Sequence, residues 1–217
     1  MLRTCKRKAM KKKCYLSDPC GASSLPFWKT ETVTIPDYLK IIRDDEYQQK
    51  KADYAGYFDE PYFKLIHFLR DLQPPTLPDG FMLAEIGIAD FARHIRECYA
   101  EGGISEADLQ RYTSHPVYDP SLWLAIKDKR TEKTAATGIA EFDARIGEGI
   151  LEWIQVSPEY RNRGLGAFVV NELLCRMQGK AGFVTVSGKV TNSTNPLSLY
   201  ERCGFSGKAI WHVIRNE

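Results

Sequence analysis

The sequence predicts an α/β fold whose strands and helices follow the order β-α-α-β-β-β-α-β-α-β over residues 80–217. Two observations carry this prediction. Apolar residues recur at helical spacing in 89–99 and 167–177, and short apolar runs with β-branched and aromatic side chains lie between such segments. A chain of 217 residues with 43% hydrophobic composition can also bury a substantial core.

A proline-rich break precedes the first predicted strand. Residues 73–78 contain three prolines, which favour an extended connector and mark the best internal boundary. The expected strands are 80–86, 122–126, 135–143, 150–156, 182–187 and 207–214. The expected helices are 89–99, a segment opened by the capping residue Ser105, 167–177 and 195–205. Glycines at 147 and 149 predict a hairpin between 135–143 and 150–156.

The N-terminal part of the chain lies outside this pattern. Residues 1–13 carry seven Lys or Arg residues and no acidic residue, although the net charge of the chain is only +2. Such a segment is either a tail for an anionic surface or nucleic acid, or a disordered, solvated start. We expect the disordered tail and no nucleic-acid partner, because the segment is short and lacks aromatic residues. Residues 14–78 form an N-terminal extension whose role the sequence does not determine. Within it, 38–43 and 62–69 resemble strands or short amphipathic elements.

Composition excludes several other classes of protein. No run of 18 apolar residues occurs, so we expect no transmembrane helix and no membrane partner. The basic start lacks the apolar segment of a secretory signal. The six cysteines form no Cys-x-x-Cys pair and the four histidines do not cluster with them, so we expect no metal site. A reducing, cytoplasmic location is the expectation.

The most informative stretch is the loop that joins the predicted strand 150–156 to the predicted helix 167–177. Gly164 and Gly166 end this loop, and glycines allow a phosphate to come close to the backbone. The N-terminus of the following helix offers unpaired N–H groups and a partial positive charge, to which Arg161 and Arg163 add cationic donors. The stretch therefore predicts a diphosphate site.

Other phosphate-binding loops fit this stretch less well. A P-loop ends in Gly-Lys-Ser/Thr, which is absent here. A dinucleotide-binding fingerprint needs a third glycine, where this chain has Val169, and an acidic ribose partner is not evident.

Two motifs resemble the GCN5-related N-acetyltransferases, the GNAT superfamily. Arg161-x-x-Gly164-x-Gly166 resembles the acyl-CoA pyrophosphate loop of that family, and Leu199-Tyr-Glu-Arg-Cys-Gly-Phe205 resembles its late helix. The order and separation of the two motifs also match. The resemblance covers about residues 80–217 and defines a domain at 79–217.

The resemblance implies a GNAT-like mixed, twisted sheet with helices on both faces, and acetyl-CoA as co-substrate. The implied activity is acetyl transfer to a primary amine of a small molecule, amino acid or peptide. The alternative is a non-catalytic acyl-CoA-binding sensor or scaffold. Pantetheine would insert between the strands 150–156 and 183–187 and pair with the backbone near Ile154 and Val156. The residues implied around the pyrophosphate are Arg161, Arg163, Gly164, Leu165, Gly166 and Ala167.

Candidate catalytic residues follow from the same resemblance. Tyr200 is either the acid that protonates the CoA thiolate or a core tyrosine. Glu152 is either the base that deprotonates the amine through water or a surface residue, and it alternates with Trp153 along the strand. Glu141 and Asp143 are fallback bases. Asn192 and Asn195 either cap the late helix or contact CoA.

The sequence does not identify the amine that accepts the acetyl group. It does not determine the oligomeric state either, and a homodimer is one alternative. Acidic residues near the cleft would suit a cationic amine. Four aromatic residues either line an aromatic pocket or belong to the core: Tyr112, Trp123, Phe142 and Trp153.

Overall fold

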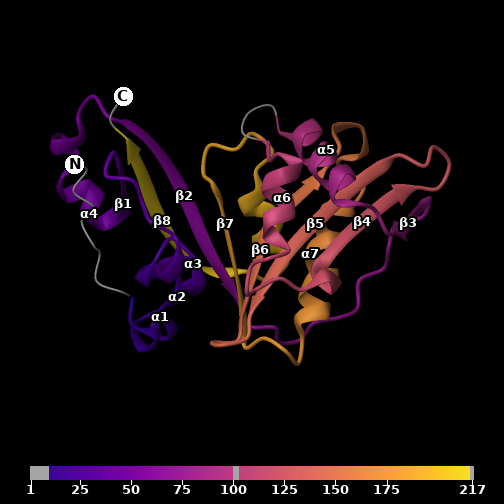
Figure 1. The fold of residues 1–217 in the computed structure, drawn as a ribbon, viewed down its shortest axis with the longest axis horizontal. Coiled ribbons are helices and arrows are strands. Elements are labelled where there is room, and N and C mark those ends of the chain that lie inside the picture. The colour runs from indigo at the N-terminus through magenta and orange to yellow at the C-terminus, as the bar shows by residue number, and fades with distance from the viewer. Residues whose placement is uncertain (1–9, 100–102, 216–217) are drawn as a thin grey trace. The chain divides into compact units, whose positions relative to one another are not determined.

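The computed structural model describes residues 10–99 and 103–215. The chain divides into two compact units (Figure 1). Unit 1 joins the N-terminal segment up to His67 with the segment from Thr185 onward, and unit 2 spans Phe68–Val184. The predicted α/β class is confirmed, because the described residues form eight strands together with helices.

Unit 2 contains an antiparallel sheet in the order β6-β5-β4-β3. Its strands are β3 (Phe81–Ala84), β4 (Trp123–Asp128), β5 (Thr134–Asp143) and β6 (Glu148–Val156). The predicted hairpin is confirmed: β5 and β6 pair antiparallel, and Gly147 in their connection has a φ of +70°. This positive φ explains why glycine occupies the position.

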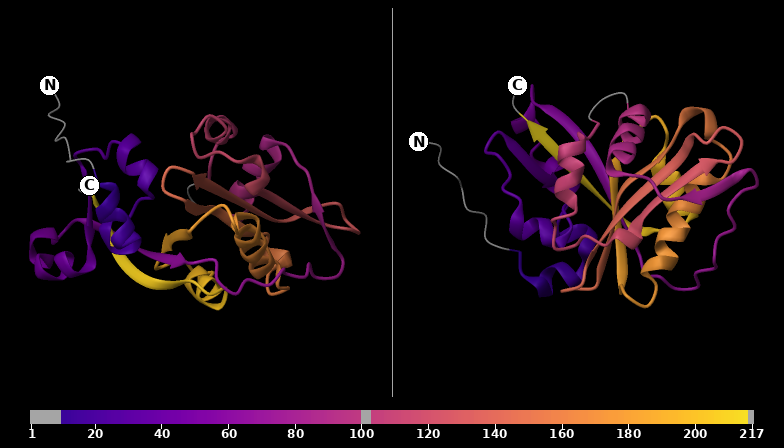
Figure 2. Two further views of the ribbon diagram at one scale, coloured as in Figure 1. Left: turned by 90° about the horizontal axis from the view of Figure 1, so that it is seen from below. Right: turned by 45° about the vertical axis from the view of Figure 1, so that its right-hand side comes forward.

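Helices cover both faces of the unit 2 sheet (Figure 2, left). On one face, Phe91 and Ile95 of α5 and Leu109 of α6 pack in a buried cluster with Ile139 of β5. On the other face, a Cβ atom on the neighbouring Gly138 would meet Val169 of α7 at 2.4 Å. The helices and 3-10 turns of this unit are α5 (Ile88–Cys98), α6 (Glu106–Tyr112), η2 (Pro120–Leu122), η3 (Pro158–Tyr160) and α7 (Leu165–Met177).

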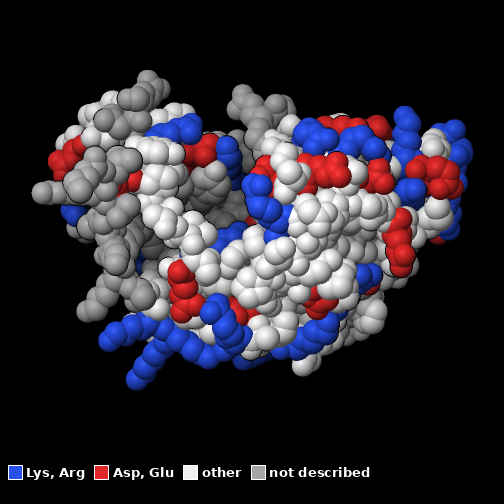
Figure 3. Space-filling view, viewed as in Figure 1, with Lys and Arg blue, Asp and Glu red and all other residues white. Residues whose placement is uncertain are grey.

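The outer side of α5 is charged and solvated. Arg93 pairs with Asp90 at 2.6 Å and with Glu97 at 3.9 Å, at the i,i+3 and i,i+4 positions where helical side chains meet. Basic and acidic side chains are correspondingly intermixed over this part of unit 2 (Figure 3). The apolar side of α5 therefore faces the sheet.

Unit 1 is built on β8, which lies between β1 and β2 and pairs antiparallel with both. The predicted N-terminal extension thus supplies both partners of the C-terminal strand. β7 (Phe183–Lys189) continues from unit 2 into unit 1. The other elements of unit 1 are α1 (Lys12–Ser17), α2 (Pro19–Ala22), α3 (Phe27–Thr32), β1 (Leu39–Arg43), α4 (Asp44–Gln49), η1 (Lys51–Tyr54), β2 (Phe58–His67), α8 (Pro196–Arg202) and β8 (Ser206–Arg215).

A buried lysine fixes the first helices of unit 1 to β2. Lys64 is 1% exposed, and its Nζ donates to the Tyr15 hydroxyl and to the carbonyls of Ser23 and Leu25 at 2.9–3.0 Å. These contacts hold α1 in the folded structure, and α1 begins at Lys12. Residues 12 and 13 of the expected disordered tail at 1–13 are therefore helical, and that part of the expectation is wrong. The rest of that expectation, at residues 1–9, lies outside the described residues.

A histidine organises the polar segment to which the sequence assigned no structure. The Nδ1 of His212 on β8 lies 2.9 Å from Asp59, and its Nε2 lies 3.0 Å from Asp44 at the start of α4. The Tyr47 ring stacks on the imidazole at 3.9 Å. Segment 44–60 thus folds against β8 through two of its acidic residues, which bind His212.

Candidate functional site

The glycine loop of unit 2 connects the end of β6 to α7 as expected. Gly164 is the N-cap of α7 and has a φ of +80°, which side chains of L-residues rarely adopt. The first turn of α7 contains no acidic residue, so nothing within it offsets the positive end of the helix dipole. Leu165 is buried, whereas Gly166 and Ala167 are partly exposed. The loop therefore presents the N–H groups of a 13-residue helix at the surface.

The two loop arginines are exposed and fold back on the loop. Arg161 Nε donates to the carbonyl of Val156 at 3.3 Å. Arg163 Nη2 donates to the carbonyl of Glu159 at 3.2 Å, and its guanidinium lies 5.4 Å from the Tyr160 ring. A guanidinium has five N–H donors, and these contacts use one from each arginine. Both side chains can therefore also contact an anion.

A buried polar network lies behind this loop, between α5 and the ends of β5 and β6. His94 is 2% exposed, with Nδ1 2.9 Å from Thr137 Oγ1 and Nε2 2.8 Å from Ser157 Oγ. Ser157 donates its hydroxyl to the carbonyl of Thr134 at 3.0 Å, so it accepts from His94. His94 is consequently the Nε2–H tautomer, and Thr137 donates to Nδ1. Sequence reasoning missed this network, because its members are up to 63 residues apart.

The network is chemically inert toward protons near neutrality. Burial lowers the pKa of His94 to about 4. Burial also raises the pKa of the Cys98 thiol, whose Sγ lies 3.6 Å from His94 Nε2, to about 11. Within residues 10–99 and 103–215, the side-chain Oε1 of Gln155 is the buried polar atom without a partner. The network therefore shapes the end of β6 and supplies neither a base nor a thiolate.

Glu152 occupies a β-bulge. Ile139 pairs with Trp153 and Ala140 pairs with Leu151, so Glu152 is the extra residue between them. The bulge interrupts the regular alternation of side chains along β6 at Glu152. That Glu152 and Trp153 point to opposite sides of the strand stays a prediction. Downstream of the bulge, Ile154 contacts the α7 side, where its Cδ1 would meet a Cβ on Gly138 at 3.3 Å.

The two fallback carboxylates differ in their partners. Asp143 is 1% exposed and accepts from Arg145 Nε at 3.0 Å and Nη2 at 2.8 Å, so it is neutralised by a structural ion pair. Glu141 is 2% exposed, and its Oε1 lies 3.3 Å from His115 Nδ1. Sequence reasoning missed His115, since it follows α6 and is 26 residues from Glu141.

Unit 1 holds the other predicted site residues. Tyr200 on α8 is 6% exposed, with its ring 6.2 Å from Phe63 and 5.7 Å from Phe205. Asn195 has a φ of +49°, caps α8 and accepts from the Ser198 N–H at 3.4 Å, as its capping alternative predicts. Asn192 accepts from the N–H of Thr194 at 2.9 Å. A contact of either asparagine with CoA stays a prediction.

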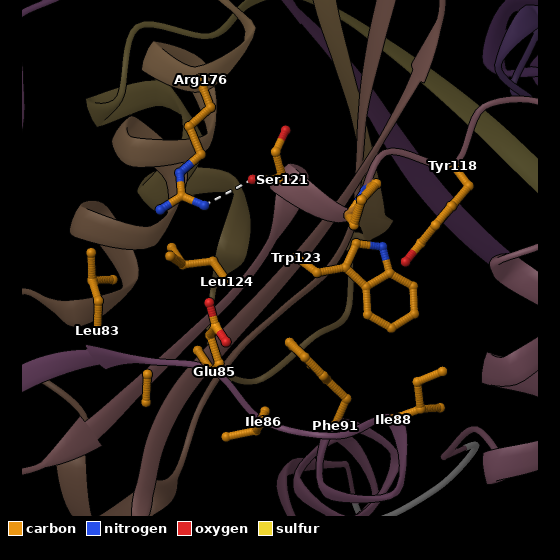
Figure 4. A pocket seen from close by; sticks show the side chains of 13 residues that line it. Leu83, Glu85, Ile86, Ile88, Phe91, Tyr118, Ser121, Trp123, Leu124 and Arg176 are labelled. Atoms are coloured by element: carbon orange, nitrogen blue, oxygen red, sulfur yellow. Dashed lines mark hydrogen bonds between the residues drawn. The ribbon is translucent and has the colours of Figure 1, made fainter.

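A pocket of about 640 Å³ opens at the outer part of unit 2, where β4 continues beyond the last β3 pair (Figure 4). The Trp123 ring lies 5.2 Å from Phe91 and 5.7 Å from Tyr118, which makes one wall aromatic. Arg176 Nη1 donates to the carbonyl of Ser121 at 2.8 Å. Trp123 lines this pocket, as one alternative predicted, whereas Tyr112, Phe142 and Trp153 are not among its lining residues.

Membrane spans and metal sites are both lacking in the described part of the chain. No helix among residues 10–99 and 103–215 is long and apolar enough to cross a membrane. No group of three or more His, Cys, Asp or Glu residues in the same ranges could hold a metal ion.

Part of the chain matches a known family model. Residues 119–207 match the family model described as an acetyltransferase (GNAT) domain. This range includes the glycine loop, the β6 bulge and Tyr200. No match to a curated protein was found.

Solved structures share the fold at low sequence identity. A GCN5-related N-acetyltransferase from Sphaerobacter thermophilus is 18% identical with a TM-score of 0.68, covering 88% of this chain and 64% of that one. A Drosophila protein is 17% identical with a TM-score of 0.61, covering 89% and 67%. A GCN5-related N-acetyltransferase from Kribbella flavida is 16% identical with a TM-score of 0.53, covering 82% and 68%. The chain thus spans slightly less than two thirds of the first of these proteins.

Proposed function

We propose that the chain is an acyl-CoA-dependent N-acetyltransferase, because residues 119–207 match the model of an acetyltransferase (GNAT) domain. It transfers an acetyl group from acetyl-CoA to a primary amine of a small molecule, amino acid or peptide. The observation that carries the proposal is the N-terminus of α7 at Gly164, with its positive φ and its acid-free first turn.

The pyrophosphate of acetyl-CoA would bind at this helix N-terminus. The N–H groups of Leu165, Gly166 and Ala167 donate to its oxygens, and the helix dipole favours its negative charge. Arg161 and Arg163 add charge-assisted hydrogen bonds through the N–H donors that the loop does not use. Backbone groups at Ile154 and Val156 on β6 pair with the pantetheine amides. These four kinds of contact together recognise the pyrophosphate and the pantetheine of CoA.

The transfer needs a neutral amine and a proton for the departing thiolate. In this proposal Tyr200 supplies that proton. Glu152, at the β6 bulge, remains a candidate to accept a proton from the amine through water. A bulge suits this task, because it redirects a side chain from the plane of a regular strand.

A non-catalytic acyl-CoA-binding protein is the second candidate. One observation favours it: Tyr200 is 6% exposed and packs its ring near Phe63 and Phe205 in the manner of a core residue. A binder would retain the glycine loop and its affinity for CoA but would not cleave the thioester.

Thermal unfolding with acetyl-CoA tests the shared part of both candidates. A ligand at 100 times its Kd stabilises a protein by about 2.7 kcal/mol, and each kcal/mol raises the Tm of a chain this long by roughly 2–4 °C. We expect such a rise with acetyl-CoA and none with adenosine or inorganic phosphate. No shift with millimolar acetyl-CoA would contradict the cofactor assignment.

A further inference from the structure

A carboxylate–imidazole pair lies on the α5–α6 face of unit 2. Glu141 of β5 is 2% exposed, whereas the His115 side chain is 27% exposed. The Oε1 of Glu141 and the Nδ1 of His115 are 3.3 Å apart. The pair therefore joins a buried carboxyl group to a partly exposed imidazole.

The turn that carries His115 is fixed to β5 next to Glu141. The His115 N–H donates to the carbonyl of Tyr112, and the His115 carbonyl accepts from Tyr118 N–H, at 3.0 and 3.1 Å. The N–H of Phe142, the residue after Glu141, donates to the Val117 carbonyl at 2.8 Å. The Tyr112 ring lies 4.9 Å from the imidazole. These contacts restrict the position of the imidazole, as a catalytic group requires.

The arrangement favours one tautomer of His115. A carboxylate beside Nδ1 accepts the Nδ1–H, which leaves the lone pair on Nε2, and it stabilises the imidazolium form. His94, the other histidine of unit 2, has the opposite properties. Both of its ring nitrogens face hydroxyl groups, and burial lowers its pKa to about 4. His115 is consequently the unit 2 histidine that is suited to exchange a proton.

Aromatic side chains connect this pair to the bulge of β6. The Tyr112 hydroxyl accepts from Trp153 Nε1 at 3.3 Å, and Trp153 directly follows the bulged Glu152. The Tyr99 ring lies 5.6 Å from the Trp153 ring, and all three aromatic residues are partly exposed. Aromatic faces attract cations, and the carboxyl of Glu141 contacts the imidazole that lies at the Tyr112 ring. The chemistry of this surface fits an ammonium group on an aromatic or apolar carrier.

We propose that His115 is the general base that deprotonates the acceptor ammonium, and that Glu141 is the positioning residue that orients it. The inference rests on the proposed acetyl transfer. Nε2 of neutral His115 takes one proton from R–NH₃⁺, and the resulting amine attacks the thioester carbonyl carbon. The C–S bond breaks and Tyr200 gives its proton to the thiolate. Tyr200 then regains a proton from the amine nitrogen, and the third amine proton stays on the amide nitrogen. Imidazolium then releases its proton to solvent, so the products are the amide, CoA thiol and one proton.

The first test follows the His115 imidazole by NMR titration and needs no acceptor. We expect the midpoint of its titration to fall in Glu141→Gln, because a neutral amide no longer stabilises the imidazolium. Asp143→Asn is the matched control, since it neutralises a buried carboxylate on the same strand that pairs with Arg145 instead. An equal midpoint in the wild type and Glu141→Gln, in a folded protein, would overturn the role of Glu141.

The second test compares two acceptors with acetyl-CoA: 2-phenylethylamine, which is protonated at pH 7.5, and hydroxylamine, which is neutral there. We expect His115→Asn to lower kcat/KM for 2-phenylethylamine by roughly 100-fold and to spare hydroxylamine. The deficit should shrink as the pH rises and the amine loses its proton unaided.

The outcomes separate this inference from the proposed function. If the wild type acetylates neither acceptor, the assignment of an acetyltransferase acting on such amines fails. If the wild type acetylates both and His115→Asn retains its rate with 2-phenylethylamine at pH 7.5, only the role of His115 is overturned. An equal loss with both acceptors would also overturn it, since a general disturbance of the site would then be the cause.

Discussion

The Nε2 atom of His94 lies 2.8 Å from the Oγ atom of Ser157, and this contact joins α5 to the first residue after β6. Ser157 also begins the loop that leads to Gly164. The conformation of the loop thus depends on a helix more than 60 residues earlier in the chain. The contact is made by a neutral imidazole, so it is sensitive both to substitution and to acid.

Replacing His94 with Ala should destabilise the protein. The substitution leaves two buried hydroxyl groups, on Thr137 and Ser157, without their histidine partner, and each such loss costs about 1–3 kcal/mol. We expect the free energy of unfolding in urea to fall by at least about 2 kcal/mol. Ser157→Ala removes one of these partners and should cost about half as much. Equal stability of wild type and His94→Ala would show that the network is not formed in solution.

Stability should also decrease in mild acid because of His94. Its pKa is lowered from 6.5 to about 4 in the folded state, so the unfolded chain binds more protons between these values. The contribution is fully present above pH 6.5, decreases as the pH falls toward 4, and amounts to about 3 kcal/mol at 1.36 kcal/mol per pKa unit. Unfolding free energies of wild type and His94→Gln, measured from pH 7.5 to 4, should converge as the pH falls. Parallel curves would contradict the assignment of a neutral buried imidazole.

Substitution of Gly164 by Val should weaken acetyl-CoA binding at least about tenfold. A β-branched residue cannot readily adopt the φ of +80°, and its side chain would stand where the phosphates approach the backbone. Gly179→Val is the matched control, because Gly179 has a φ of +78° just beyond the other end of α7, and a Cβ added there would have no atom within 4 Å. Titration calorimetry with acetyl-CoA should show a loss confined to Gly164→Val. A similar Kd for both variants would remove the loop from the cofactor site.

Tyr200→Phe should lower turnover more than affinity. The substitution keeps the ring that lies near Phe63 and Phe205 and removes only the hydroxyl proposed to protonate the thiolate. We expect kcat to fall by about 100-fold while the Kd for acetyl-CoA changes little. Tyr200→Leu, which also removes the ring, should in addition reduce stability. A kcat equal to that of wild type in Tyr200→Phe would assign the residue to the core alone.

Local patterns in the sequence predicted the strands and helices from residue 80 onward and the glycine loop, but not the helices α1 to α4. The Gly164 turn and the α7 stripe are set by neighbouring residues, so they are visible without tertiary structure. The position of Lys64 beneath Tyr15 was not visible, because a lysine in a strand is ordinarily solvated. The bulge at Glu152 was not predicted for a related reason: it is a property of the β5–β6 register, which no single strand encodes.

The same limit applies to the candidate site. Glu141 was identifiable as a carboxylate on a central strand, but its partner His115 comes from the turn after α6 and meets it only in the folded protein. Conversely, Asp143 is equivalent to Glu141 in the sequence pattern, but in the structure its carboxylate forms an ion pair with Arg145. Contacts between residues distant in the sequence therefore decide which carboxylate can take part in the proposed proton transfer.

The most direct test of acetyl transfer is a product assay with acetyl-CoA labelled in its acetyl group and a panel of primary amines. The account predicts labelled acetylamide and free CoA thiol in equal amounts, at a rate well above the uncatalysed reaction. Binding of acetyl-CoA without any labelled amide, across small amines, amino acids and peptides, would contradict it and identify the protein as a non-catalytic acyl-CoA binder.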